Sequence, residues 1–302
     1  MIATLPTRKT APMLEELQEV WRFRYLLRQF VARELKIRYK NSVFGVLWSV
    51  VPLIISVLVY SFLFSSVVGK KIDNYSAYAL CGIIPWTFFT TACLDSCQSL
   101  LNNYAIMKKV YLPREIIPLS YVISNGIHFL VGWAFYFTTF YLIWPLVLHI
   151  HIPILPSIIW FPVVLVMEVL LVLGLSFWFA ALNLYYQDVK YVLQTLFGLL
   201  LFLLPILYPA YIHYEGLQNR GMSWAYSLYL VNPITAVLTG FREALLQPVG
   251  PEKWNDKLHG LSRDLLYAPA WTYVVAIVLT FLILWSGYAF FNYRKWQFVE
   301  RH

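Results

Sequence analysis

Charge is what this sequence lacks most. Only 13% of its 302 residues are charged, whereas 60% are hydrophobic and 18% are aromatic, and the mean hydropathy is +0.63. A soluble domain has nearer a quarter of its residues charged, so this composition indicates a protein that folds in a lipid bilayer. The alternative, a large soluble all-helical protein, would show polar helix faces that these segments lack.

Motifs for chemistry are also missing. We find no Gly-x-Ser-x-Gly, no His-Glu-x-x-His and no paired carboxylates. The histidines are scattered, and His149 and His151 alone are too few to indicate a metal site. The odd set Cys81, Cys93 and Cys97 lies in one apolar segment and predicts small core residues rather than disulfides. We therefore expect no catalytic residue and no metal site.

The sequence also lacks the phosphate-binding pattern Gly-x4-Gly-Lys-Ser/Thr. If ATP drives this protein, ATP and Mg must be bound by a separate subunit. No hydrophobic signal-peptide region precedes the first apolar segment, because residues 1–42 are polar and basic.

What the chain does have is a series of long apolar segments. Each approaches the roughly 20 residues that span a bilayer as a helix. The prediction is an all-α integral membrane protein with about six transmembrane helices in a single domain, residues 43–293, before a short tail, 294–302. The predicted spans cover about residues 43–68, 75–101, 116–148, 157–184, 189–208 and 266–293.

Lysine and arginine predict the orientation. An even number of spans places both termini on one side, and sixteen of the 23 basic residues fall on that side. Since basic residues concentrate on the cytoplasmic side of bacterial membranes, both termini are expected in the cytoplasm.

Two segments depart from simple spans. Residues 14–40 predict a basic amphipathic helix lying in the cytoplasmic interface, although Arg24 at the edge of its apolar face leaves contact with a partner protein open. The segment 210–265 is too apolar for a solvated loop and is broken at Asn232-Pro233. It predicts short helices that re-enter the outer leaflet, with an amphipathic surface hairpin as the alternative. The two faces of the first helix are Phe23, Leu27, Phe30 and Val31 against Arg22, Gln29, Arg33 and Lys36.

Two acidic residues lie inside the predicted spans. Charged side chains in a membrane are functional candidates, so Asp95 and Glu168 are candidates for the substrate pathway. A structural hydrogen bond to a neighbouring Tyr or Trp is the alternative for Glu168.

Several stretches together resemble the permease subunits of ABC exporters for O-antigen polysaccharides and wall teichoic acids. In the family's order they run from about residue 30 to residue 245. They are Arg33-Glu34-Leu35-Lys36-Ile37-Arg38-Tyr39-Lys40-Asn41-Ser42-Val43-Phe44-Gly45-Val46-Leu47-Trp48 with Pro52, Cys81-Gly82-Ile83-Ile84-Pro85-Trp86, Lys108-Lys109-Val110-Tyr111-Leu112-Pro113-Arg114-Glu115-Ile116-Ile117-Pro118, Leu182-Asn183-Leu184-Tyr185-Tyr186-Gln187-Asp188-Val189, Leu204-Pro205-Ile206-Leu207-Tyr208-Pro209, and Asn232-Pro233 with Phe241-Arg242.

The resemblance implies a homodimer that works with two copies of an ABC ATPase and exports a polymer on an undecaprenyl-pyrophosphate carrier. Residues 102–115 look like the element that couples to the ATPase, although ordinary membrane anchoring explains their basic residues equally well. The segment matching 210–245 looks like the outer gate. The coupling residues are Lys108, Lys109, Val110, Tyr111, Leu112, Pro113 and Arg114, with Pro113 expected at the first position of a helix, and the gate residues are Asn232, Pro233 and Arg242.

Aromatic side chains suit a sugar polymer, because sugar rings stack on flat apolar faces. Phe62, Trp86, Phe88 and Phe89 are the candidates for such a lining, with lipid or helix packing as the alternative for each. The basic residues before the first span are candidates for contacts to the carrier's pyrophosphate, although anionic lipid headgroups explain them as well. They are Arg33, Lys36, Arg38 and Lys40.

The substrate stays open at this stage. The sequence does not distinguish a teichoic acid from an O-antigen or capsular polysaccharide, and we place the phosphate-rich teichoic acid first. An exporter of a drug or small lipid in the same permease superfamily is an alternative, and a membrane-bound polymer-modifying transferase is a further one without a supporting motif.

Overall fold

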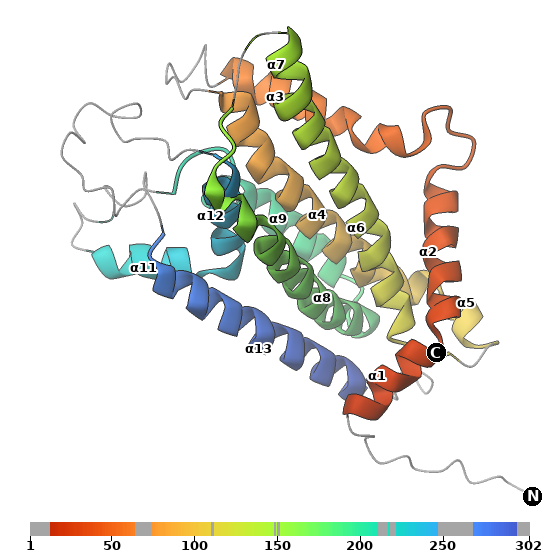
Figure 1. Ribbon diagram of the computed structural model, residues 1–302. Helices are drawn as coiled ribbons and strands as arrows, with labels where there is room; N and C mark the ends of the chain where they lie inside the picture. Colours follow the sequence, from red (N-terminus) through yellow and green to blue (C-terminus); the bar gives the residue numbers. More distant parts are fainter. Residues whose placement is uncertain are drawn as a thin grey trace, which may run out of the picture.

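The computed structural model describes residues 13–63, 74–109, 112–147, 149, 152–210, 217, 222–246 and 268–294. Every regular element in these residues is a helix, and the helices form one bundle (Figure 1). In chain order they are α1 (Met13–Arg22), α2 (Arg24–Arg38), the 3-10 helix η1 (Gly45–Ser49), α3 (Val51–Phe62), α4 (Tyr75–Asn102), α5 (Tyr104–Met107), α6 (Ile116–Phe137), the π-helical η3 (Thr138–Ile143), α7 (Trp144–Val147), the 3-10 helix η4 (Pro156–Trp160), α8 (Phe161–Tyr185), α9 (Val189–Leu203), α11 (Ser223–Val231), α12 (Pro233–Leu245) and α13 (Ala270–Arg294).

Four continuous helical segments are long and apolar enough to cross a membrane. They are Tyr75–Asn102, Ile116–Val147, Pro156–Tyr185 and Ala270–Arg294, with mean hydropathies of 1.5, 1.5, 2.6 and 2.3. They coincide with the second, third, fourth and sixth predicted spans. The prediction of an all-helical, multi-pass membrane protein is therefore confirmed.

The first predicted span becomes α-helical later, and the fifth ends earlier, than their apolar sequences suggest; residues 64–68 of the first lie outside the described residues. The first begins with the 3-10 turn η1, and its α-helix α3 starts only at Val51. In the fifth, α9 ends at Leu203 rather than near residue 208, and Leu204 is extended. Pro205 follows directly, and the residue before a proline is sterically driven out of the helical conformation. A hydropathy average does not detect the late start of α3 or the early end of α9, because the residues on both sides of these points are apolar.

The central helix of the bundle is α4. Of its most apolar 18-residue window 78% is buried inside the molecule, against 22–33% for the other three long helices. It packs against α6 and α8, and α8 packs in turn against α13. The three cysteines predicted as core residues lie on α4 and are all buried and free.

Helix α2, the predicted basic amphipathic helix, packs its apolar face on other helices of the bundle. It runs beside the first half of α6 (Figure 1), and Phe30 is buried in a cluster with Leu100, Ile116 and Ile117. Its last residues approach His128, twelve residues past the start of α6 or about 18 Å along the helix axis. Its apolar face therefore covers the protein's own helices, and its basic end, with Lys36, Arg38 and Lys40 exposed, lies beside the middle of α6.

Candidate functional site

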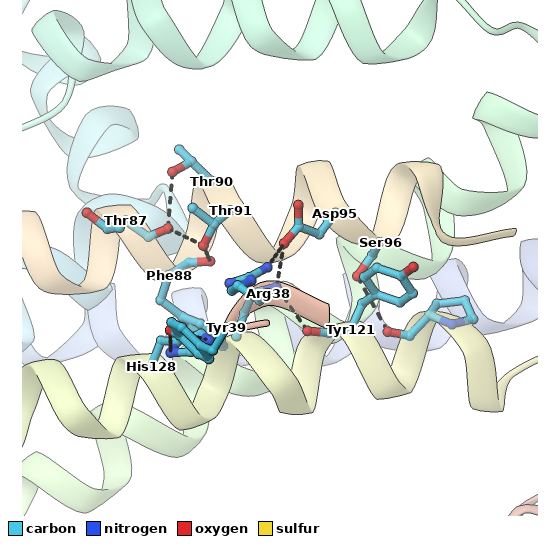
Figure 2. A network of polar contacts seen from close by, with 12 residues as sticks. Arg38, Tyr39, Thr87, Phe88, Thr90, Thr91, Asp95, Ser96, Tyr121 and His128 are labelled. Atoms are coloured by element: carbon cyan, nitrogen blue, oxygen red, sulfur yellow. Dashed lines mark hydrogen bonds and ion pairs between the residues drawn. The ribbon is translucent and has the colours of Figure 1, made fainter. Parts of the chain in front are cut away.

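Arg38 at the end of α2 is held by two polar side chains of the bundle. Its guanidinium donates to a carboxylate oxygen of Asp95 on α4 at 2.5 Å and to the side-chain oxygen of Asn125 on α6 at 3.0 Å. The Asn125 amide donates to the same Asp95 oxygen at 2.9 Å. The three side chains form a closed triangle across three helices, and Figure 2 shows its pair of Arg38 and Asp95. We call it the Arg38–Asp95 bridge.

The described residues of the chain cover the ion pair in this bridge only in part. The side chains of Arg38 and Asp95 are 38% and 35% exposed. An ion pair at such exposure contributes less than about 1 kcal/mol, because water screens it. The bridge is therefore a contact that a stronger anion or cation can exchange.

A second polar pair lies one residue further along. The Tyr39 hydroxyl is 3.0 Å from Nδ1 of His128 on α6, and the two rings meet edge to face (Figure 2). Partial burial raises the pKa of Tyr39 above its usual range, so its hydroxyl stays protonated and can donate to the imidazole. The pair fixes the start of the loop that leads from α2 to η1.

A cavity of about 520 Å³ opens beside these two pairs, between the end of α2, the start of α3, α4 and α6. This volume falls in the range of small-molecule sites. Its lining combines aromatic rings with hydroxyl, amide and imidazole groups, so we call it the aromatic cavity. Lining side chains include Tyr39, Trp48, Thr87, Phe88, His128 and Phe129.

A second cavity, of about 510 Å³, adjoins the first. Its lining is mainly polar or charged, and we call it the polar cavity. Arg38 lines both cavities. Other residues around the polar cavity include Arg33, Glu34, Asp95, Asn102, Asn103 and Tyr121.

Helical spacing explains how the sequence builds this site. On α4, Thr87, Thr91 and Asp95 recur every four residues, and on α6 Asn125 and His128 are three apart. Residues at these intervals share one helix face. Asp95 and Arg38 were expected as candidates, whereas Tyr39, Asn125 and His128 were missed, although the polar pair on an otherwise apolar span was a readable signal.

The structure does not bring the four predicted aromatic residues together. Phe88 lines the aromatic cavity and stacks on Phe129 with ring centroids 4.5 Å apart. Trp86 and Phe89 lie on another face of α4, where both pack against Phe197 of α9. Phe62, at the end of α3, is 68% exposed. Of the four, Phe88 is the one at the candidate site.

Of the other predicted pathway and carrier residues, some line one of the two cavities and others do not. Arg33 lines the polar cavity and donates to Asn103 and Glu34, whereas Lys36 and Lys40 are exposed. Glu168 is only 1% exposed and lines neither cavity. Its Oε2 atom has no hydrogen-bond partner among the described residues.

The predicted coupling segment consists of the single-turn helix α5 followed by an exposed turn. Lys108 and Lys109 are exposed, whereas Leu112 and Pro113 are buried. Val110 and Tyr111 lie outside the described residues. Pro113 is not the first residue of a helix as predicted, because α6 begins at Ile116. The proline in the first turn of α6 is Pro118, where a missing N–H costs no helical hydrogen bond.

Two of the predicted gate residues make hydrogen bonds from their side chains to backbone groups. Asn232 caps α12 by accepting the Ile234 N–H at 3.1 Å, and Pro233 is the first residue of that helix. Arg242 is buried and donates to the carbonyl oxygens of three residues that follow α9. These carbonyls belong to Pro205, Ile206 and Tyr208.

A multi-pass bundle with a basic, partly aromatic cavity among its helices has the properties of a membrane permease. The chain belongs to the ABC-2 type transporter family, whose model matches residues 25–246. It is 29% identical over 275 residues to the O-antigen export system permease protein RfbA of Klebsiella pneumoniae, covering 89% of this chain and 91% of the relative. It is 27% identical over 291 residues to the RfbA protein of Myxococcus xanthus, covering 95% and 99%.

Proposed function

We propose that this chain is the transmembrane subunit of an ATP-driven exporter that moves a polysaccharide on an undecaprenyl-pyrophosphate carrier across the cytoplasmic membrane. The observation that carries the proposal is the joint lining of the aromatic cavity. It places an arginine, suited to phosphate, beside aromatic rings and hydrogen-bonding groups suited to sugars. An apolar drug could not form hydrogen bonds with these polar lining groups.

An O-antigen-type polysaccharide is the favoured polymer. The relatives that align over most of this chain are named O-antigen export permeases. They favour this class over the teichoic acid that the sequence alone placed first.

The basic end of α2 supports a homodimer with a hydrated path between its two copies. Arg38, Lys36 and Lys40 lie near Tyr39, which reaches about 18 Å along α6. Exposed charges beside a membrane-spanning helix are costly in lipid. A second copy and a water-filled path between the two would cover them.

Two copies of a separate ATPase, holding ATP and Mg, would drive the transport by pushing on residues 102–115. Leu112 belongs to the same buried cluster as Ile116 of α6 and Phe30 of α2. Movement at the cytoplasmic turn would therefore reach two of the helices that line the aromatic cavity. The push transports substrate only if the cavity binds it differently in the two conformations.

The test is co-purification with the ATPase encoded beside this chain, followed by ATP hydrolysis and polymer export in vesicles. Lys109→Glu reverses an exposed charge and should lower complex formation or ATP hydrolysis about tenfold, while Lys109→Arg should retain both. Arg114→Glu is the weaker probe, because Arg114 is partly buried and its loss also affects folding. Failure to bind any ATPase would refute the proposal and turn attention to proton-driven transport through Asp95 and Glu168.

A further inference from the structure

The Arg38–Asp95 bridge stands at the boundary between the two cavities. Along α4, Thr87 and Thr91 line the aromatic cavity, and Asp95 lines the polar cavity. Along α2, Arg33 lines the polar cavity and Tyr39 the aromatic one. Arg38 is therefore the side chain that the described linings of both cavities share.

We propose that Asp95 occupies the phosphate site of Arg38 when no substrate is bound, and that the pyrophosphate of a lipid-linked substrate displaces it. This inference rests on the proposed export function. The occupied site would consist of Arg38 and Asn125, with the sugar next to the phosphate in the aromatic cavity. Asp95 is the internal competitor.

The chemistry of the three groups favours this exchange. Guanidinium binds phosphate oxygens through two parallel hydrogen bonds, and a pyrophosphate carries more charge than one carboxylate. The partial exposure of both side chains lets an anion approach. After displacement the Asn125 amide, which now donates to Asp95, can donate to the phosphate instead.

Arg242, in the same bundle, is an arginine that is not available to bind phosphate. It is 7% exposed, and its guanidinium already donates to backbone carbonyl oxygens. Those carbonyls belong to the turn that follows α9. A carboxylate on an exposed side chain can rotate away, whereas a backbone carbonyl cannot, so Arg38 is the exchangeable site and Arg242 is not.

The experiment measures farnesyl diphosphate binding by calorimetry to the permease–ATPase complex in lipid nanodiscs. Asp95→Asn keeps the side-chain shape and removes the competing charge, so the Kd should fall about two- to fivefold, the range expected for a partly exposed ion pair. Asn125→Asp adds a second competitor beside Arg38 and should raise the Kd by a similar factor. Shifts of opposite sign cannot both come from misfolding.

The double variant Arg38→Gln/Asp95→Asn tests whether Asp95 acts through Arg38. Arg38→Gln alone should weaken binding, and adding Asp95→Asn should then restore nothing. A gain that persists without Arg38 would overturn the proposal, as would unchanged binding in Asp95→Asn. Asp188→Asn, at an exposed carboxylate in the turn before α9, is the matched control and should leave the Kd unchanged.

Two further measurements are needed. One distinguishes a lipid headgroup from free pyrophosphate as the ligand, and the other distinguishes failure of the exchange from failure of the proposed function. Farnesyl diphosphate should bind more tightly than inorganic pyrophosphate, and equal binding would overturn the assignment to a lipid headgroup. Polymer export by the unmodified complex is measured alongside. If the complex exports polymer but Asp95→Asn leaves the Kd unchanged, the exchange alone is rejected. If Asp95→Asn lowers the Kd as expected but the complex exports no polymer, the proposed function is rejected.

Discussion

Arg242 stabilises a piece of non-helical backbone inside the bundle. Its Cζ lies 3.9 Å from the centre of the Tyr78 ring, and its guanidinium donates to carbonyls in the turn after α9. A methyl group on Gly82 would lie 2.3 Å from the Ile206 oxygen, so only glycine lets α4 come this close. Irregular backbone at membrane depth persists where protein satisfies its polar groups, and here a side chain does so.

Removal of the Arg242 guanidinium should therefore destabilise the protein. Arg242→Met leaves buried carbonyls without donors and should lower the free energy of unfolding by about 3 kcal/mol, the scale of a lost charged hydrogen bond with its desolvation cost. Arg242→Lys should rescue this only in part, because one ammonium lacks the planar fork. Thermal unfolding of the detergent-solubilised protein measures the loss. Arg28→Met, at an exposed position on α2, is the control, and an equal loss there would contradict the assignment.

The residues of the candidate site were partly predictable. Charge in an apolar context singled out Asp95, and a basic stretch before the first span singled out Arg38. Their meeting was not predictable, because 57 positions separate them and packing of α2 against the bundle brings them together. For the aromatic residues the sequence left two roles open, since an apolar ring satisfies a helix interface and a cavity equally well.

Helices α8 and α13 meet backbone to backbone. A methyl group on Gly287 would lie 2.1 Å from the Gly174 carbonyl oxygen, and one on Gly174 would lie 2.7 Å from the Leu284 Cα atom. Small residues permit such close packing in membranes, where van der Waals contact holds helices together. The contact joins the third and the fourth of the long apolar helical segments, which are far apart in the sequence.

Gly287→Ala should separate these two helices and lower the free energy of unfolding by about 1–3 kcal/mol, as overpacking does in tight cores. Gly198→Ala is the matched control, because nothing lies within 4 Å of a methyl group there. It should be neutral or stabilise α9 by up to about 1 kcal/mol through helix propensity. Comparable losses in both variants would show that helix packing is not the cause.

The packing of α2 was only partly predictable. The sequence indicates both its apolar face and its basic face, but a membrane surface and a protein surface both favour this amphipathic pattern. Arg24 at the edge of the apolar face is exposed in the structure and lies over the Trp21 ring. Amphipathicity thus fixed which side of α2 is buried, but not what buries it.

At the scale of the whole molecule, the apolar segments predict the bundle well, because hydropathy reports directly on lipid contact. The breaks within it depend on single residues such as Pro205, which a hydropathy average does not register. The orientation of the bundle in the membrane rests on the distribution of basic residues. We propose that both termini face the cytoplasm.

Cysteine labelling across α8 tests this orientation. The native cysteines Cys81, Cys93 and Cys97 are at most 1% exposed, so they should give little background with an impermeant maleimide. Ile154→Cys and Gln187→Cys place exposed thiols at opposite ends of α8. In intact spheroplasts the first should label and the second should not, and permeabilisation should make both label. The reverse pattern would place the termini outside, where an ATPase and its ATP would not reach residues 102–115.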